Sequence, residues 1–474
     1  MERTETDALG SRSLPETARH GIHTLRALEN FPLLGQPVHR DLARAFGAVK
    51  LAALRTNREL GYFPDAAQAD ALERACREMF EGSLCADVVV DALQGGAGTS
   101  TNMNVNEVLA NRALELLGRP RGSYDAVSPA EHVNLHQSTN DTFPTALRIA
   151  AIWGLRGLER AVLGLQEAFQ DRERAFAHVV KLGRTEYQDA VLTTLGRGMG
   201  AYAEALSRDR WRLAKCEERL RVVNLGGTAI GTGLAAPREY IFRVTDVLRD
   251  ITGLGLARAE NLVEATQNAD VFVEVSGLVK ALAASLVKIS GDLRLLGSGP
   301  DGGLGEIRLP ARQAGSSLMP GKVNPVIPEA VTQAAILAIG RDHALTAAAS
   351  MGSLELNAFL PLIAHCLLGN FDLLAGACAI LDTHCVRGIE ADEAGCRRHV
   401  DNATASATAL VPLIGYGRAT ELVALARARG AGLKETAVGG GFVTAEQFDA
   451  CTSAEAVSRL GFRAPGTGPA RGGR

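Results

Sequence analysis

The chain has 474 residues, of which 46% are apolar and 22% are charged, and its formal net charge at pH 7 is −3. This length allows two or three domains, and the apolar share allows a large core. Acidic and basic residues are interspersed, which argues against a nucleic-acid-binding protein and a protein of the membrane surface. The eight cysteines form no C-x-x-C pair and no short cluster with histidine. We therefore expect reduced thiols, a cytoplasmic protein and no metal site.

The N-terminus lacks the apolar core that a secretion signal needs, because residues 1–20 are mostly polar. We expect these residues to form an extended or disordered arm. The stretch Leu360–Leu381 is long and apolar enough to be considered as a membrane span. It contains His365, Asn370 and Asp372, which are costly in lipid, so a buried bundle helix explains it better. The sequence thus predicts a protein without a membrane partner.

The first half of the chain reads as helices separated by loops. Apolar residues at three- and four-residue steps over 42–53 predict a helix. Residues 92–106 are polar and glycine-rich, and a helix follows to Leu117. No G-K-[ST] sequence follows these glycines, which excludes a nucleotide-binding loop. Capping boxes are predicted at two helix starts, by Asp65 with Gln68 and by Thr444 with Gln447.

Two long helices are the main feature of the middle of the chain. Asn140 provides a capping side chain and Pro144 a first-turn proline for the first of them. Apolar residues then recur at three- and four-residue steps over 151–169, and again over 272–289. Because both patterns are sustained, we expect these helices to pack side by side in a bundle. Further helical stretches are expected over 202–222 and 328–350.

The predicted fold class is predominantly all-α, because alternation typical of strands is almost absent. We expect a mainly helical N-terminal domain over 1–140 and a central bundle of long helices over 141–390. A small helical C-terminal domain should follow over 391–474. Within it, residues 464–474 are rich in glycine, proline and arginine, which predicts a disordered tail.

The most unusual stretch is the loop Gly315–Pro325, with the sequence GSSLMPGKVNP. It has neither helical nor strand periodicity. Its glycines allow main-chain N–H groups to converge on an anion. Two hydroxyls, one ammonium and one amide on such a loop form a candidate site for a small carboxylate. On composition alone, the alternative is an ordinary surface turn.

This loop resembles the signature of the aspartase/fumarase superfamily, and three further stretches match that family's motifs. They are Gly95–Asn104 (GGAGTSTNMN), Gln137–Asp141 (QSTND) and, with one change, Gly183–Ala190 (GRTEYQDA). Separated motifs in the right order are far more specific than any one of them. The similarity extends from about residue 21 to about residue 444, so the chain is identified as a member of this superfamily.

The resemblance implies a particular chemistry. Superfamily members remove a proton beside one carboxylate of a substituted succinate and expel the group on the neighbouring carbon to give fumarate. Charge builds up on that carboxylate, so preorganised hydroxyl, amide and ammonium donors are needed. Ser316 aligns with the general base, whose oxyanion needs backbone N–H groups, and Ser317 is the structural alternative. The resemblance assigns substrate binding to Thr99, Ser100, Thr101, Asn102, Ser138, Thr139, Asn140, Thr185, Glu186, Lys322 and Asn324, with Met319 and Glu329 in supporting positions.

Glu186 departs from the family pattern. Fumarases and several aspartases have histidine here, paired with a glutamate that aligns with Glu329. Two carboxylates close together cannot both ionise easily, so one pKa should rise if these residues meet. The other interpretation is that Glu186 faces the ammonium of an amino acid substrate. Smaller departures are the lack of proline after Val191 and the sequence Arg197–Met199 in place of Gln-Glu-Phe, and both could alter the substrate pocket.

The activity that the resemblance implies is elimination of ammonia from L-aspartate to give fumarate, without a cofactor. The sequence His23-Thr24-Leu25-Arg26 and the motif Ser138-Thr139-Asn140 favour this branch of the family. The alternatives are a lyase for another 2-substituted succinate, such as an N-substituted aspartate or nitrosuccinate, and then fumarate hydratase. A non-catalytic structural protein is disfavoured by the intact Ser316 and Lys322. The resemblance also implies a homotetramer, in which each active site combines motif regions from three chains.

Overall fold

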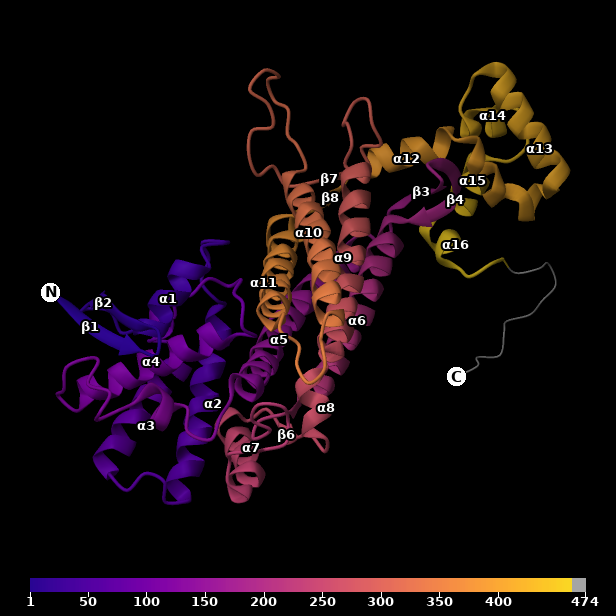
Figure 1. Cartoon of the computed structure of the whole chain (residues 1–474). Coiled ribbons are helices and arrows are strands. Elements are labelled where there is room, and N and C mark those ends of the chain that lie inside the picture. The colour runs from indigo at the N-terminus through magenta and orange to yellow at the C-terminus, as the bar shows by residue number, and fades with distance from the viewer. Residues whose placement is uncertain (463–474) are drawn as a thin grey trace. The chain divides into compact units, whose positions relative to one another are not determined.

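The computed structural model describes residues 1–462 and is predominantly helical, which confirms the predicted fold class (Figure 1). The tail expected to be disordered, 464–474, lies outside the described residues. The long helices are α5 (Thr139–Ala175), α6 (Leu195–Leu220), α9 (Asp270–Leu296), α10 (Val326–Ser350) and α11 (Leu360–His384). The shorter helices are α1 (Ile22–Asn30), α2 (Arg40–Glu59), α3 (Ala66–Glu81), α4 (Thr99–Leu116), α7 (Arg238–Thr252), α8 (Leu262–Gln267), α12 (Glu393–Asn402), α13 (Val411–Arg429), α14 (Leu433–Gly439), α15 (Ala445–Cys451) and α16 (Ala454–Ser458).

Strands occur only as two-stranded pairs within the described part of the chain. Three pairs are antiparallel and one, β5 with β6, is parallel. The strands are β1 (Glu2–Asp7), β2 (Gly10–Pro15), β3 (Val180–Thr185), β4 (Gln188–Thr194), β5 (Val222–Val223), β6 (Ala257–Arg258), β7 (Ile307–Arg308) and β8 (Glu390–Ala391). Short helices of the 3₁₀ or π type lie at Cys85–Asp87, Pro129–Val133, Val386–Gly388 and Thr404–Leu410.

The chain divides into two compact units, and the long helices pass from one to the other. Unit 1 comprises Met1–Arg160, Asp209–Ala284 and Ala334–Ala375. Unit 2 comprises Ala161–Arg208, Ser285–Gln333 and Gly376–Arg474. This division groups the residues by contacts, and the three domains expected along the sequence stay a prediction.

In unit 1 the long helices are held together by apolar packing with a few buried polar contacts. The Arg148 guanidinium of α5 lies 5.4 Å from the ring centroid of Phe272 on α9. Ser276 of α9 donates its hydroxyl to Asp342 of α10 at 2.7 Å. Phe371 of α11 is buried against α5. The bundle expected from the apolar repeats is therefore present in this unit.

In unit 2, α5, α6 and α9 contact one another, and the β3–β4 hairpin is joined to the segment after α9. Phe169 of α5 and Tyr202 of α6 have ring centroids 5.5 Å apart. The Tyr202 hydroxyl donates to Asp292 of α9 at 2.8 Å. Glu306 is fully buried, and its carboxylate pairs with Arg184 of β3 at 2.7 Å. The hairpin is thus anchored by a buried charge pair.

Two described helical stretches, 360–388 and 404–429, are long and apolar enough to cross a membrane by length and composition alone. The most apolar part of the first is 56% buried and that of the second is 22% buried. The first contains α11, the expected bundle helix, whose Phe371 and Leu374 are buried.

Helix caps were predicted with mixed success. Asp65 accepts hydrogen bonds from the N–H groups of Ala67 and Gln68, but the Gln68 side chain donates to the Ala126 carbonyl at 2.7 Å. The first capping box is therefore only half formed, because the Gln68 side chain bonds to a carbonyl far away in the sequence and not to the backbone of Asp65. The second box, Thr444 with Gln447, is complete and confirms the prediction.

Residues 1–20 form an ordered hairpin and a connecting segment. The strands pair from Glu2 with Pro15 to Asp7 with Gly10. Arg26 of α1 donates two hydrogen bonds of 2.8 Å to the Asp7 carboxylate. The arm expected from the sequence is thus extended and is held by tertiary contacts that the local sequence does not reveal.

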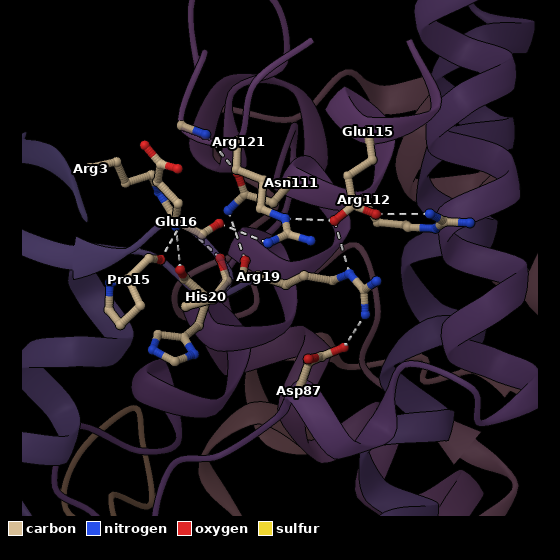
Figure 2. Close-up of polar contacts among 12 residues, drawn as sticks. Arg3, Pro15, Glu16, Arg19, His20, Asp87, Asn111, Arg112, Glu115 and Arg121 are labelled. Carbon is tan, nitrogen blue, oxygen red and sulfur yellow. Dashed lines mark hydrogen bonds and ion pairs between the residues drawn. The ribbon is translucent and has the colours of Figure 1, made fainter. Parts of the chain in front are cut away.

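Figure 2 shows how the segment after the hairpin is fixed to the end of α4. Glu115 accepts hydrogen bonds from Arg19 at 3.0 Å, Arg121 at 2.6 Å and Arg112 at 2.8 Å. Arg19 also donates to Asp87 at 2.9 Å. Burial opposes ionisation of Glu115, but the three guanidinium groups outweigh it and hold its pKa below the usual range.

The start of α1 is capped from a distance. Gly21 and Thr24 donate their N–H groups to one oxygen of the buried Glu107 at 2.8 and 3.1 Å, and the Thr24 hydroxyl donates to the same oxygen at 2.6 Å. Burial nevertheless raises the pKa of Glu107. A Cβ on Gly21 would lie 2.7 Å from Oε2 of Glu5 and from the hydroxyl of Tyr124. No side chain fits here without moving a buried polar group.

Gly21→Ala should therefore destabilise the protein by about 1–3 kcal/mol, the usual range for overpacking a rigid site. The midpoint of urea unfolding, monitored by circular dichroism, measures the change. Gly157→Ala on α5 is the matched control, because the nearest atom to its added Cβ is the end of a flexible arginine at 3.9 Å. Equal midpoints for the two variants would contradict the packing argument.

Candidate functional site

The loop with the sequence GSSLMPGKVNP lies in unit 2 and is closed by two hydrogen bonds at its neck. The Gly315 N–H donates to the Lys322 carbonyl at 2.8 Å. The Asn324 side-chain amide donates to the Gly315 carbonyl at 2.6 Å. A Cβ on Gly315 would lie 2.5 Å from the Lys322 carbonyl oxygen, so only glycine fits at the neck. Gly321 turns the chain with φ 78°.

Ser316 sits at the start of this loop with its hydroxyl oxygen facing the main chain. Its Oγ accepts hydrogen bonds from the N–H groups of Leu318 at 3.1 Å and Met319 at 2.9 Å. Two N–H donors are what a serine oxyanion requires, and they lower the energy of the deprotonated form. Ser317 is exposed. The geometry therefore distinguishes Ser316, whose oxygen has two N–H donors, from the exposed Ser317.

A cavity of about 560 Å³ in unit 2 adjoins the loop and is lined by Lys322, Asn324 and Glu329. Arg294 and Arg308 also line it. Glu329 lies 3.7 Å from Arg294, measured from Oε1 to Nη2. The two arginines lie outside the matched motifs, so sequence reasoning missed them, and a lone arginine gives no local signal. The cavity thus contains three cationic groups, two of which, Arg294 and Arg308, are paired with the carboxylates of Glu329 and Asp392.

Thr185 and Glu186 lie at the turn of the β3–β4 hairpin, also in unit 2. Glu186 and Tyr187 both have positive φ, at 53° and 62°, and both are exposed. Positive φ at both central residues is what a two-residue type I′ hairpin turn requires, so the turn itself accounts for this conformation. Thr185 pairs with Gln188 across the turn. The backbone thus presents this motif outward.

Glu186 lines a second cavity of unit 2, of about 500 Å³. The same cavity is lined by Arg197, Gly198 and Met199, the other positions that depart from the family pattern. Glu329 lines the first cavity instead. Within one copy of the chain, Glu186 and Glu329 thus line different cavities, and the carboxylate pair stays a prediction.

The remaining predicted residues lie in unit 1. Gly98 is the N-cap of α4 with φ 92°, and a Cβ there would overlap Phe143 at 2.2 Å. Thr99 is exposed and Ser100 is partly exposed, whereas Thr101 and Asn102 are buried. The Thr101 hydroxyl donates to Gln94 at 3.0 Å. This motif thus presents some donors to solvent and uses others to hold the turn.

Ser138, Thr139 and Asn140 form the start of α5. The fully buried Asp141 accepts hydrogen bonds from the N–H groups of Ser138 at 3.0 Å, Gly226 at 3.2 Å and Thr228 at 3.0 Å. The Asn140 amide donates to the Ala229 carbonyl at 2.8 Å. Sequence reasoning missed this supporting loop, 224–236, although its glycine density is a signal for irregular backbone beside a site.

The structure brings two of the matched motifs together within unit 1. The Asn102 amide donates to the Thr139 hydroxyl oxygen at 3.1 Å, although the residues are separated by 37 positions in the sequence. Each unit therefore carries part of the predicted set, with hydroxyl and amide donors in unit 1 and the serine loop, lysine and hairpin turn in unit 2. Hydroxyl, amide and ammonium donors are the groups that bind a carboxylate.

Comparison with known proteins identifies the class. A sequence model for the family described as "Lyase" matches residues 10–340, and one described as "Fumarase C C-terminus" matches residues 407–458. The chain belongs to the aspartase/fumarase superfamily of lyases.

Its relatives within that class share most of its length. It is 48% identical over 436 residues to the aspartate ammonia-lyase of Pseudomonas canavaninivorans, covering 91% of this chain and 92% of that protein. It is 41% identical over 465 residues to the aspartate ammonia-lyase of Escherichia coli, covering 98% and 97%.

Two solved structures have the same fold. The fumarate lyase:delta crystallin from Brucella melitensis bound to cobalt has a TM-score of 0.91 and 46% identity, covering 95% of this chain and 98% of that one. The class II fumarase from Schistosoma mansoni has a TM-score of 0.87 and 33% identity, covering 96% and 98%.

The closed neck of the serine loop is open to a direct test. Asn324→Ala removes the 2.6 Å hydrogen bond to Gly315. Amide hydrogen exchange over residues 311–325, measured by mass spectrometry, should become about tenfold faster, as loss of one net hydrogen bond implies. Ser317→Ala, which alters an exposed side chain of the same loop, should leave the exchange unchanged. An unchanged rate in Asn324→Ala would show that the bond does not hold the neck.

Proposed function

We propose that this protein is an aspartate ammonia-lyase, a carbon–nitrogen lyase that converts L-aspartate to fumarate and ammonia. The observation that carries this proposal is its similarity to proteins of that name, from 41% to 48% identity over more than nine-tenths of the chain. The serine loop, with its two N–H donors on Ser316, supports the same reaction.

The proposed reaction begins when the Ser316 oxyanion takes a proton from the carbon beside the side-chain carboxylate. The electron pair left on that carbon moves into the carboxylate to form an aci-carboxylate with one additional negative charge. Lys322 and Asn324 hold this group in the proposal, and the lysine charge offsets the new one. The electron pair then returns to form the carbon–carbon double bond as the C–N bond breaks and ammonia leaves. Ser316 finally releases its proton to solvent, which regenerates the oxyanion.

The other donors orient the substrate in this proposal. Thr99, Ser100, Ser138 and Asn140 are partly or fully exposed and can donate to a carboxylate. Thr139 lies at the edge of the surface, with 8% of its area exposed. Thr101 and Asn102 are buried and support these donors, Thr185 joins them from the hairpin, and Glu186 faces the substrate ammonium.

We also propose a homotetramer in the cytoplasm, in which each site combines motif regions of three chains. Helix α10 is apolar, yet its Ile336 is 58% exposed and its Leu337 is 49% exposed. Gly340 lies on the same exposed side, and a Cβ there would meet no other atom. A long helix that is apolar on every side is normally buried, so these residues are suited to packing against further copies of the chain.

A second candidate function is elimination from another 2-substituted succinate. The cavity beside Glu186, lined by Arg197, Gly198 and Met199, favours an N-substituted aspartate, because it could accept a group on the amino nitrogen. Nitrosuccinate follows, and fumarate hydratase is third because histidine is missing at Glu186. A non-catalytic structural protein would not need Ser316 with two oriented donors.

The first prediction of this proposal is that the wild-type protein produces fumarate from L-aspartate, seen as rising ultraviolet absorbance. Ser316→Ala should lower kcat at least about 10³-fold because it removes the base, whereas Ser317→Ala should stay within about threefold of wild type. Activity only on N-substituted aspartates or nitrosuccinate would favour the second candidate. Full activity in Ser316→Ala would reject the assigned base.

The second prediction concerns the tetramer. Light scattering should give a molar mass near four times 49.9 kDa for the wild type. Leu337→Arg should lower this mass and abolish turnover together, because a buried charge at a helix interface is unpaired. Leu413→Arg on α13, which has the same 49% exposure, is the matched control and should leave both unchanged. A tetramer with Leu337→Arg would place the interface elsewhere.

A further inference from the structure

A buried ammonium lies beneath the donors of unit 1 and has no role in the reaction described above. Lys50 on α2 is 1% exposed, and its Nζ donates to Oδ1 of Asn134 at 3.0 Å. Burial lowers the pKa of Lys50 to about 7, and the nearby charge of Asp141 opposes that shift. A lysine is rarely buried unless its charge is paired, because removing the charge from water is costly.

Asn134 is the centre of a small network of side-chain amides. Its Oδ1 accepts hydrogen bonds from Lys50 and from the amide nitrogens of Asn102 at 3.1 Å and Asn106 at 3.2 Å. Its own Nδ2 donates to the Gln137 carbonyl at 3.2 Å. The Gln137 carbonyl can only accept, so Asn134 must turn its Nδ2 toward that carbonyl and its Oδ1 toward Lys50, which donates to it.

The orientation of the Asn134 amide also determines that of the Asn102 amide. Because the Asn134 oxygen faces it, Asn102 must present its Nδ2 on that side. The same Nδ2 donates to the Thr139 hydroxyl oxygen at 3.1 Å, and the Asn102 Oδ1 lies 3.5 Å from the Thr142 hydroxyl. Asn102 is 1% exposed, so water cannot substitute for these partners.

The consequence at Thr139 is a hydroxyl with a defined direction. Its oxygen is already an acceptor of the Asn102 amide, so its proton is left to be donated elsewhere. A substrate carboxylate accepts hydrogen bonds and donates none, so this polarity is the one it needs. If the Asn102 amide were flipped, its oxygen would compete with the substrate for the Thr139 proton.

We propose that Lys50 and Asn134 are positioning residues that set the direction of the hydrogen-bond chain Lys50–Asn134–Asn102–Thr139, so that the Thr139 hydroxyl donates to the substrate carboxylate. The inference rests on the proposed function, because it takes Thr139 as a carboxylate ligand. It adds two residues outside the substrate-binding set and assigns Asn102 an indirect role. Neither added residue needs to touch the substrate.

A double-mutant cycle distinguishes this role from a merely structural one. Lys50→Met keeps the length of the side chain and removes the ammonium, and Thr139→Val removes the hydroxyl at the end of the chain. We expect Lys50→Met to lower kcat/KM for L-aspartate about 10- to 100-fold in the wild-type background. In the Thr139→Val background the same change should cost less than about threefold, because its target is already absent.

The Asn134 variants provide a rescue test. Asn134→Asp loses the Nδ2 bond to Gln137 but keeps oxygen atoms that accept from Lys50 and Asn102, so it should retain activity within about tenfold of wild type. Asn134→Leu has a similar volume and no acceptor, and it should behave like Lys50→Met in the cycle. Lys280→Met is the control, because this lysine pairs with the buried Asp342 at 2.6 Å and, in the described part of the structure, has no bond to the Lys50–Thr139 hydrogen-bond chain. The effects of Lys280→Met and Thr139→Val on kcat/KM should therefore be additive.

Affinity for succinate, measured by calorimetry on the same variants, separates the inference from the proposed function. If the wild type binds succinate but does not react with L-aspartate, the proposed substrate is rejected. The double-mutant cycle measured on succinate affinity would then still test the inference. A wild type that neither binds nor reacts would overturn both. Equal losses from Lys50→Met in the two Thr139 backgrounds would overturn the inference. Failure of Lys50→Met and both Asn134 variants to fold would also overturn the inference, because these hydrogen bonds would then serve stability alone.

Discussion

One buried carboxylate, that of Asp141, fixes the part of the structure on which the donors of unit 1 depend. It is fully buried in the first turn of the longest helix and accepts three backbone N–H groups, from Ser138, Gly226 and Thr228. These bonds join the start of the helix to an irregular loop 85 residues away in the sequence. Burial raises the pKa of Asp141 to about 7, while the hydrogen bonds oppose that rise.

The same constraint explains why the surroundings are rich in glycine and polar side chains. Irregular backbone beside long apolar helices leaves N–H and C=O groups that must find partners. Side-chain carboxylates and amides supply them at Asp141, Asn140 and Asn134. Glycine is required where the backbone approaches too closely for a Cβ, as at Gly231, whose Cβ would lie 2.4 Å from the Leu262 backbone. Polar support and close packing therefore arise together.

Much of the fold could be predicted because it depends on local pattern. Helical periodicity located α5, α9 and α10. The predicted cap of α5 was wrong, because α5 already begins at Thr139, the Asn140 amide donates to the Ala229 carbonyl, and Pro144 lies beyond the first turn. The capping box at Thr444 is as local as a signal can be. The serine loop was found from its residue types and its resemblance to a family.

The parts that escaped prediction are set by contacts between residues far apart in sequence. The cap of α1 by Glu107 spans 86 residues, and the bond between Lys50 and Asn134 spans 84. Neither partner has an unusual sequence context, so no window of local sequence contains the information. The same holds for Gln68, whose capping role was displaced by a carbonyl 58 residues away. Tertiary competition for donors is invisible until the fold brings the competitors together.

The two groups of predicted residues differ in how firmly they are held, and the chemistry accounts for the difference. Thr139 and Asn102 lie in a buried network whose orientation is fixed before any ligand arrives, which suits groups that must aim donors at a carboxylate. Ser316 lies in a loop closed by two hydrogen bonds, next to Leu318, which is 86% exposed. A serine oxyanion is strongly hydrated in open solvent and is a useful base only when water is excluded. An exposed apolar side chain beside the proposed base is suited to that exclusion, because covering it removes apolar surface from water.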